Sequence, residues 1–430
     1  MNTVVAPLAG SLGSSAERFL RARLLSRLAG LRHGRLEVSD ALGTVVLGPG
    51  AAEPSVRLLV SDMGFYRRVA AGGSVGAGEA YIDGLWRCSA PGMDESDALV
   101  ALVRLLVRNR DLLDGLESGW ATLAGSLRRL WHAARRNSRS GSRRNIAAHY
   151  DLSNEFFGLF LSADLMYSSA LWSDAADTLE TASARKLEAV CRRLGLSDSD
   201  HVLEIGTGWG GFALYAARHY GCRVTTTTIS RNQYDLARER VQAAGLEQRI
   251  ELRLADYRDL TGHYDKVVSI EMIEAVGADN LETYFATLGR LLRPHGAALV
   301  QAITIEDHRY QQALRSVDFI QRHVFPGSFI PSVSAMLAAN SRASNLTPVA
   351  LQDFGDSYAR TLEAWRHRFL RQLPAVRALG FDERFIRLWE FYLAYCEGGF
   401  HERSIGVAHL KLVKPLWRPT GEESTAWMPA

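Results

Sequence analysis

The sequence predicts two domains: a smaller α+β domain followed by a larger α/β domain with a doubly wound parallel sheet. The chain has 430 residues, more than one compact core usually contains. Hydrophobic residues make up 47% and charged residues 23%, which is typical of globular proteins and excludes wholesale disorder. From residue 145 onward, β-rich runs alternate with helical patterns, as in sheets whose parallel strands are joined by helices.

The first 125 residues predict the smaller domain. Residues 15–31 predict an amphipathic helix with leucines on one face and arginines around it. Alternating patterns over residues 36–46 and 55–60 predict strands, and residues 97–113 predict a helix with one buried side.

Residues 126–144 predict a basic linker, because they contain seven arginines and no acidic residue. Together with the basic helix over residues 15–31, this run predicts a reversible contact with an anionic membrane surface. A nucleic-acid partner is not expected, because Trp131 is the one aromatic residue in the run and the net charge of the chain is only +3.

The sequence also contains evidence about the cellular location of the protein. No apolar run approaches the roughly 20 residues that span a bilayer, and the N-terminus lacks the basic start of a secretory signal. The four cysteines show no paired spacing, so neither a metal site nor a disulfide framework is predicted. We therefore expect a cytoplasmic protein, peripheral on the inner face of the membrane.

Residues 145–418 predict the larger domain, and residues 419–430 a flexible tail. The predicted strands of the sheet are residues 202–205, 223–227, 250–253, 266–270 and 297–302. Helical patterns lie between these strands, and the chain becomes helical again after residue 361.

The sharpest local signal is Val202-Leu-Glu-Ile-Gly-Thr-Gly-Trp-Gly-Gly211. Here a buried strand runs into a glycine-rich turn that opens a helix, an arrangement that presents backbone N–H groups to a ligand. The spacing of Gly206, Gly208 and Gly211 also fits the dinucleotide fingerprint, which is weak on its own.

Two features favour S-adenosylmethionine over a nicotinamide dinucleotide. Glu204 places a carboxylate at the end of the strand, which suits the cationic amino acid portion of S-adenosylmethionine better than a pyrophosphate. The next strand, residues 225–230, contains no acid for a dinucleotide ribose. The loop therefore predicts an S-adenosylmethionine site.

A set of motifs in a specific order runs through most of the chain. They are Gly78-Glu-Ala-Tyr-Ile-Asp-Gly84, His149-Tyr-Asp-Leu-Ser-Asn154, Met166-Tyr-Ser-Ser-Ala-Leu-Trp172, Asp256-Tyr-Arg-Asp-Leu260, Glu271-Met-Ile-Glu-Ala-Val-Gly277, Phe325-Pro-Gly327 with Pro331-Ser332, Tyr358 with Thr361-Leu-x-x-Trp365, and Tyr392-Leu-x-x-Cys396 with Gly399-Phe400. In this order they resemble the cyclopropane-fatty-acyl-phospholipid synthases. The resemblance implies a Rossmann-like class I methyltransferase sheet with a helical cover.

The resemblance also assigns binding residues. It places the cofactor against Tyr167, Ser168, Glu204, Gly206, Gly208 and Gly210, with Thr228, Ile229, Ser230 and Gln233 at the ribose and Asp256 and Tyr257 at the adenine. It implies a bound bicarbonate ion held by Ser169, Glu274, Gln301, Tyr358 and the backbone of Ile303. Two of these positions depart from the commonest pattern, which has Cys at 169 and His at 301.

The implied reaction transfers a methyl(ene) group from S-adenosylmethionine to the cis double bond of unsaturated acyl chains in membrane phospholipids. Methyl transfer leaves a carbocation, which aromatic faces can stabilise; Tyr167, Tyr358 and Phe325 are the candidates. Bicarbonate would remove a proton and close a cyclopropane ring. The alternative is a C-methyltransferase of acyl chains whose product is a methyl or methylene branch.

Two more distant functions stay open at this point. A methyltransferase for small soluble acceptors would leave the N-terminal domain and the basic run idle, and a non-catalytic lipid-binding protein would not need an intact cofactor loop. The resemblance further implies a homodimer, and a first domain, residues 1–125, that positions lipid at a membrane.

Overall fold

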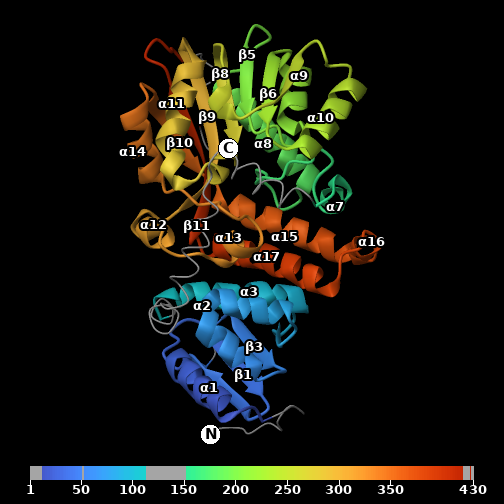
Figure 1. Ribbon diagram of the computed structural model, residues 1–430, viewed down its shortest axis with the longest axis vertical. Helices are drawn as coiled ribbons and strands as arrows, with labels where there is room; N and C mark the ends of the chain where they lie inside the picture. Colours follow the sequence, from blue (N-terminus) through green and yellow to red (C-terminus); the bar gives the residue numbers. More distant parts are fainter. Residues whose placement is uncertain (1–11, 51–52, 113–151, 420–426, 428–430) are drawn as a thin grey trace. The chain divides into compact units, whose positions relative to one another are not determined.

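The structure is a computed structural model (Figure 1) that describes residues 12–50, 53–112, 152–419 and 427. The chain divides into two compact units. The first unit comprises Met1–Ala133, Ser316–Val324 and Phe369–Ser404, and the second comprises Ala134–Arg315, Phe325–Arg368 and Ile405–Ala430.

The first unit is built on a mixed sheet. Its described elements are α1 (Ser15–Leu28), β1 (Arg35–Asp40), β2 (Gly43–Leu47), β3 (Ser55–Val60), α2 (Gly64–Ile82), β4 (Trp86–Ser89), α3 (Glu95–Arg108), α13 (Phe319–His323), α16 (Leu373–Ala378) and α17 (Glu383–His401). The strand order is β2-β1-β3-β4, with β1 antiparallel to β2 but parallel to β3. Within the described residues, no helix is long and apolar enough to cross a bilayer.

Aromatic packing brings α13 and α17 into this unit. The rings of Phe319 and Phe391 lie 4.6 Å apart, and the ring of Tyr81 lies 5.6 Å from that of Phe391. A Cβ at Gly78 would lie 2.6 Å from the Phe319 ring, so only glycine fits there. The sequence-based division at residues 145–418 therefore differs from the compact units, because two segments of that range pack with the N-terminal elements.

The predicted linker 126–144 lies outside the described residues. So does the predicted tail 419–430, except for residues 419 and 427.

The second unit contains a seven-stranded sheet with helices on both faces. Its described α-helices and strands are α7 (Asn154–Gly158), α8 (Leu179–Leu194), β5 (His201–Ile205), α9 (Gly211–Tyr220), β6 (Arg223–Thr228), α10 (Arg231–Ala243), β7 (Ile250–Leu254), β8 (Tyr264–Ile270), α11 (Leu281–Leu291), β9 (Leu292–Ile305), α12 (Asp307–Ala313), α14 (Val333–Ala343), β10 (Thr347–Asp353), α15 (Gly355–Arg371, to Arg368 in this unit) and β11 (Ile405–Val413). Short 3₁₀ turns follow β7 and β8: η1 (Tyr257–Asp259), η2 (Ile273–Ala275) and η3 (Ala278–Asn280).

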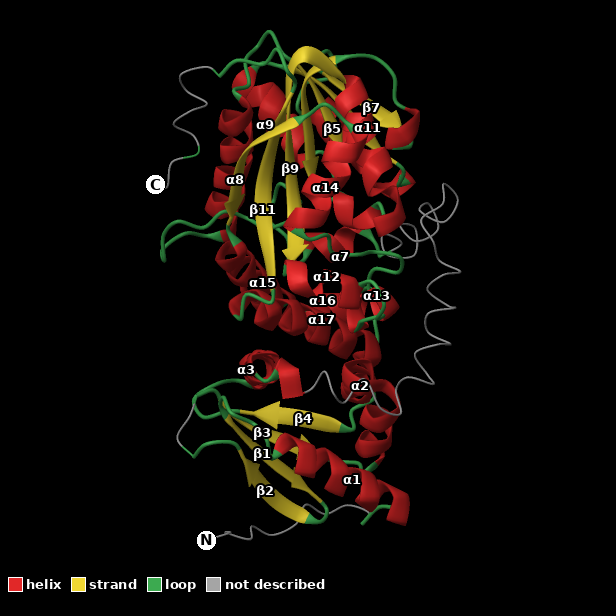
Figure 2. Cartoon of the chain, turned by 90° about the vertical axis from the view of Figure 1, so that its left-hand side faces the viewer, coloured by secondary structure: helices red, strands yellow, loops and turns green. Residues whose placement is uncertain are grey.

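The strand order is β10-β11-β9-β8-β5-β6-β7. β5 pairs in parallel with both β6 and β8, so the winding direction of the sheet reverses between β5 and β8. β11 is antiparallel to its long neighbour β9, and the two strands run side by side in Figure 2. In open α/β sheets ligands bind at the carboxyl ends of the strands beside such a reversal. The predicted doubly wound α/β sheet is confirmed.

Both faces of this sheet are apolar, as expected for parallel strands covered by helices. On one face, Leu203 of β5 belongs to a core with α11 and α14. On the other face, Val202 belongs to a core with α8 and α9. Neighbouring residues of β5 therefore serve opposite cores, and the strand ends are held rigidly.

Gly211 offers a test of how tightly α9 packs. A Cβ there would lie 2.5 Å from the Met166 sulfur and 2.8 Å from the carbonyl oxygen of Asp164. We expect Gly211→Ala to lower the free energy of unfolding by about 1–3 kcal/mol, measured in urea, because the loop backbone must shift. Gly158→Ala is the matched control, since nothing lies within 4 Å of its Cβ position among the described residues. Equal losses in both variants would contradict this packing.

Candidate active site

The glycine loop follows β5 at the point where the sheet reverses. Gly206, Gly208 and Gly210 have φ angles of 103°, 52° and 85°, which side-chain-bearing residues rarely adopt. The N–H groups of Gly206 and Thr207 both donate to the Thr227 carbonyl at 3.0 Å. Around the Cβ position of Gly208, by contrast, there is open space to 4 Å in the described structure. The loop is therefore anchored at its start and open at its middle.

Glu204 is linked to the glycine loop through two threonine hydroxyl groups. Its Oε2 accepts a hydrogen bond of 2.6 Å from the Thr226 hydroxyl, which lies 2.7 Å from the Thr207 hydroxyl. Burial raises the pKa of Glu204 to about 8, against the opposing effects of Thr226 and Lys186. The threonine-rich strand thus ties the carboxyl to the glycine loop.

The predicted ribose residues lie at the start of α10. Ser230 caps this helix by accepting from the N–H of Gln233 (3.3 Å), and the Thr228 hydroxyl donates to the Gln233 side chain (2.9 Å). Thr228, Ser230 and Gln233 are buried and Ile229 is partly exposed. The structure therefore places these four residues together at the end of β6.

The predicted adenine residues follow β7. Asp256 pairs with Arg258, with a shortest N–O distance of 2.6 Å. The Tyr257 hydroxyl is buried and has no hydrogen-bond partner among the described residues, and burial raises its pKa to about 12. The open space at Gly208 and this orphaned hydroxyl, both at the carboxyl edge of the sheet, fit an adenosyl ligand.

The ammonium group of Lys186 is a buried cation beside the predicted cofactor residue Ser168. The Lys186 ammonium is fully buried and donates to the Ser168 hydroxyl at 2.8 Å. Burial lowers the pKa of Lys186 to about 8, although the carboxylates of Glu271, Asp164 and Glu204 oppose this shift.

Glu271 is the centre of the hydrogen-bond network beyond the cofactor loop. It directly follows β8 with a φ of 48°, which is unusual for a residue with a side chain. Its Oε1 accepts from the Ser169 N–H (2.9 Å) and from the Gln301 amide (2.7 Å), and its Oε2 accepts from the Tyr358 hydroxyl (2.7 Å). Burial raises the pKa of Glu271, while these donors and Lys186 act in the opposite direction.

A series of hydrogen bonds orients the Gln301 amide. The Arg193 guanidinium contacts the Nδ1 atom of His409, and His409 Nε2 lies 2.8 Å from the Gln301 side-chain oxygen. Arg193 can only donate, so Nδ1 must accept and Nε2 must carry the proton. Burial and Arg193 hold the pKa of His409 well below its ordinary range, consistent with a neutral ring. The Gln301 oxygen therefore faces His409 and its NH₂ group faces Glu271.

Glu274 lies on η2, one turn beyond Glu271. Its Oε1 accepts from the Ile303 N–H at 2.6 Å, and its Oε2 is buried with no hydrogen-bond partner in the part of the chain that the structure describes. Burial and the charge of Glu271 raise the pKa of Glu274 to about 8.

The structure brings together the five residues predicted to hold bicarbonate, but their donors already have protein partners. The Ser169 N–H, the Gln301 amide and the Tyr358 hydroxyl bond Glu271, and the Ile303 N–H bonds Glu274. The Ser169 hydroxyl donates to the Ala170 carbonyl at 2.9 Å. In this arrangement those four N–H and O–H donors that bond Glu271 and Glu274 are engaged, and a second anion would meet the negative charge of Glu271.

An aromatic cluster adjoins this network. The Tyr167 ring lies 5.3 Å from Trp365, 6.2 Å from Phe325 and 5.2 Å from Phe157. Tyr358 joins the two features, because its ring lies 6.1 Å from Trp365 and its hydroxyl bonds Glu271. All three predicted aromatic candidates thus lie in or beside one cluster.

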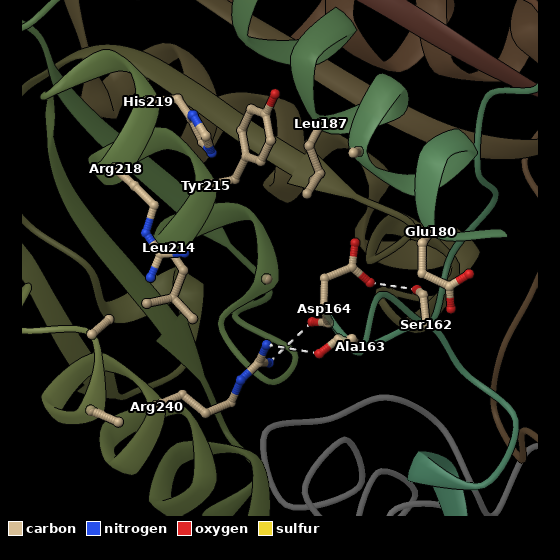
Figure 3. A pocket seen from close by; sticks show the side chains of 14 residues that line it. Ser162, Ala163, Asp164, Glu180, Leu187, Leu214, Tyr215, Arg218, His219 and Arg240 are labelled. Atoms are coloured by element: carbon tan, nitrogen blue, oxygen red, sulfur yellow. Dashed lines mark hydrogen bonds between the residues drawn. The ribbon is translucent and has the colours of Figure 1, made fainter. Parts of the chain in front are cut away.

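Figure 3 shows a pocket of about 550 Å³ between α8, α9 and α10. None of the predicted site residues lines it. Arg240 points into it and donates to the carbonyls of Asp164 (3.0 Å) and Trp209 (2.6 Å). The Asp164 carboxylate accepts from Ser162 and Ser183. These polar groups hold the loop around residues 162–166 in place.

Four residues of the network were not predicted: Glu271, Lys186, His409 and Arg193. Glu271 could have been predicted by the same signal as Glu274, because both are carboxylates just beyond the carboxyl end of a strand. Lys186 is one of only four lysines in an arginine-rich sequence. Nothing local marked His409, whose partners are over 100 residues away in the sequence.

Comparisons with known proteins agree with this geometry. The family described as "Mycolic acid cyclopropane synthetase" matches residues 137–410. The "Tuberculostearic acid methyltransferase UfaA1" of Mycobacterium tuberculosis is 38% identical over 416 residues, which cover 95% of this chain and 93% of that protein. The "Cyclopropane-fatty-acyl-phospholipid synthase" of Escherichia coli K12 is 36% identical over 358 residues, covering 83% of this chain and 87% of that protein.

Solved structures give the same result. The cyclopropane synthase MmaA2 from Mycobacterium tuberculosis superposes with a TM-score of 0.59 at 27% identity, covering 63% of this chain and 98% of that chain. Mycolic acid cyclopropane synthase CmaA1, complexed with SAH and CTAB, gives the same values. The predicted methyltransferase fold is therefore confirmed, and the chain belongs to the cyclopropane synthase family of S-adenosylmethionine-dependent methyltransferases.

Proposed function

We propose that this enzyme methylates the cis double bond of unsaturated acyl chains in membrane phospholipids and closes a cyclopropane ring. The observation that carries the proposal is the junction at Tyr358. There an aromatic cluster suited to a carbocation adjoins a carboxyl group that is hydrogen-bonded by three donors. Both features suit an acceptor that becomes cationic when it is methylated and then loses a proton, as an alkene does.

The names of the relatives support an acyl acceptor. One is a cyclopropane-fatty-acyl-phospholipid synthase and another a tuberculostearic acid methyltransferase. Because one is named for a ring-forming reaction and the other for a methyl transfer, a methyl or methylene branch is the second candidate product.

The protein's own residues supply alignment and charge. S-adenosylmethionine, held by the glycine loop and the residues that follow β6 and β7, provides an electrophilic methyl group. An alkene is a weak nucleophile, so rate depends on its alignment in a dry site. The faces of Tyr167, Phe325 and Trp365 stabilise positive charge on the acyl group through their quadrupoles.

The residues of this site do not fit a bound bicarbonate ion, because the donors predicted to hold it already bond Glu271 and Glu274. An added anion in this arrangement would suffer repulsion from Glu271 without gaining a hydrogen bond from those donors.

Of the two neighbouring acids Glu271 and Glu274, Glu274 is the one that is protonated at neutral pH. It has one N–H donor and a charged neighbour, whereas Glu271 has three donors. Its protonated carboxyl can donate one hydrogen bond, so it can orient a group in the site without adding charge.

Because Glu274 is protonated in the folded protein, the free energy of unfolding depends on pH. Its pKa of about 8 in the folded protein lies above the ordinary 4.5, so its contribution to stability is complete below pH 4.5 and is lost as the pH rises through 8. Glu274→Gln, a neutral isostere, lacks this loss. At pH 9 we expect the variant to be more stable than the wild type by on the order of 1–3 kcal/mol in urea unfolding, with the difference shrinking toward pH 5. Parallel pH profiles would contradict the assignment.

We also propose a peripheral contact with anionic lipid at the inner face of the membrane, and a homodimer on the strength of the resemblance. In α1, Arg21 turns inward to Asp40, while Arg18, Arg23 and Phe19 are exposed. The Arg23 guanidinium lies 6.0 Å from the Phe19 ring, so a cation and an apolar side chain share one surface. This combination suits a lipid headgroup region.

Vesicle binding tests this contact. Each arginine near an anionic surface contributes about 1 kcal/mol, so the double variant Arg18→Gln/Arg23→Gln should bind anionic vesicles roughly 30-fold more weakly at low salt. The control Arg231→Gln/Arg238→Gln removes the same charge from α10 in the second unit. Equal weakening by both double variants, measured by cosedimentation, would refute a contact through α1.

The function is tested by mass spectrometry of fatty acid esters from a host that lacks its own synthase, with and without this protein. We expect monounsaturated acyl groups to gain one CH₂ unit. Mild hydrogenation then distinguishes the products, since a ring survives it and an unsaturated branch becomes saturated. Unchanged acyl groups in the presence of bound S-adenosylmethionine would mean that the acceptor is a different molecule.

A further inference from the structure

We propose that Glu271 is the base of this reaction and that its carboxylate takes the proton lost by the methylated acyl group. The enzyme would then need no bicarbonate. This proposal rests on the proposed function and deepens it by naming the group that completes the chemistry.

The donor set around the Glu271 carboxylate is that of an anion site. Two N–H groups meet Oε1 and one hydroxyl meets Oε2, at 2.7 to 2.9 Å. Such short hydrogen bonds to a carboxylate are stronger than those between neutral groups and favour its ionised form. The donors belong to Ser169, Gln301 and Tyr358, three of the residues that the resemblance assigns to an anion. The protein's own carboxylate therefore occupies the place expected for a diffusible one.

Neighbouring side chains enforce this arrangement. A free glutamine amide could turn and present its oxygen to Glu271. Here Arg193 and His409 hold that oxygen on the opposite side. All three side chains, Arg193, His409 and Gln301, are buried, so their orientation is maintained by packing as well as by hydrogen bonds.

The backbone of Glu271 is strained. A φ of 48° is unfavourable for a residue with a side chain, and such strain persists where the surroundings over-determine it. The Glu271 N–H donates to the Gln301 carbonyl at 2.8 Å, so backbone and side chain both engage the same residue of β9. This strain is typical of functional sites.

The surrounding charges are compatible with a base. Lys186 offsets the negative charge of Glu271, while burial raises the pKa values of Glu274 and Glu204 and so disfavours further negative charge on these two groups. Burial also raises the pKa of Glu271 itself, which increases its strength as a proton acceptor once it is ionised. One ionised carboxylate beside a nascent carbocation is the favourable charge state.

Atoms and charge balance in the proton transfer. A C–H bond breaks in the methyl group just added, or at a neighbouring carbon of the acyl group. Its electron pair closes the three-membered ring or forms the double bond of a branch. The proton passes to Glu271, so a cationic acyl group and a carboxylate become an uncharged acyl group and a carboxylic acid. That proton leaves for solvent before the next turnover.

The test compares the wild type with Glu271→Gln, Glu271→Gly and the control Glu282→Gln in CO₂-free buffer and in added bicarbonate. The substrates are unsaturated phospholipid vesicles and S-adenosylmethionine. Glycine tolerates positive φ, so Glu271→Gly relieves backbone strain while it removes the carboxyl group. Glu282 is an exposed carboxylate on α11 that pairs with Arg342.

We expect the wild-type rate to be the same in both buffers and Glu282→Gln to match it. Glu271→Gln should be slower by about 100-fold or more, which is typical of losing a general base. Glu271→Gly should be similarly slow in CO₂-free buffer, and bicarbonate or formate should accelerate it at least roughly tenfold by entering the vacated place. Calorimetry should show unchanged S-adenosylmethionine binding in both variants.

Three results would overturn the proposal: a wild type that stops in CO₂-free buffer and recovers with bicarbonate, a Glu271→Gln variant at the wild-type rate, or Glu271 variants that lose cofactor binding. The last result would assign Glu271 to the architecture of the site. A wild type that makes no acyl product in either buffer would instead refute the proposed function, and it would do so before any variant is compared.

Discussion

The hydrogen bonds that converge on the Glu271 carboxylate are the constraint on which the active site depends. They join the end of β8 to β9 through Gln301, to α15 through Tyr358 and to the loop before α8 through Ser169. Removing the carboxylate would take these hydrogen bonds away, and a buried donor left without a partner costs about 1–3 kcal/mol. A carboxylate at this point thus joins three separate elements to the end of β8.

The same constraint explains how several acids coexist beside one lysine. Glu271, Glu274 and Glu204 differ in the number of donors that reach them, and only Glu271 has three. Lys186 lies near Glu271 and Glu204, and its own pKa is lowered by burial. Ionising one carboxylate in such a place is favourable, whereas ionising all three would be strongly opposed by repulsion and desolvation. Charge, and with it chemistry, is concentrated at one side chain.

Much of this site could be predicted from the sequence because its signals are local. The glycine spacing after β5, the carboxylate at Glu204 and the residues at the start of α10 all follow a strand end within a few residues. The anion set was found by motif, but its occupant was not, because the identity of the occupant depends on contacts between β8, β9, β11 and α15. The place of α17 in the first unit was missed for a similar reason: its ring contacts with Tyr81 and Phe319 are distant in sequence. Local pattern predicts elements and loops, whereas such non-local packing decides which groups end up as partners.

Whether the protein itself supplies the active-site anion is tested most directly by a bicarbonate titration. The wild-type enzyme, with S-adenosylhomocysteine present, is titrated with ¹³C-labelled bicarbonate while the ¹³C resonance is recorded. For the wild type we predict only the ¹³C resonance of free bicarbonate. For Glu271→Gly we predict an additional resonance from bicarbonate bound to the protein. A saturable bound signal in the wild type, lost when Gln301 or Tyr358 is replaced, would contradict an anion supplied by Glu271.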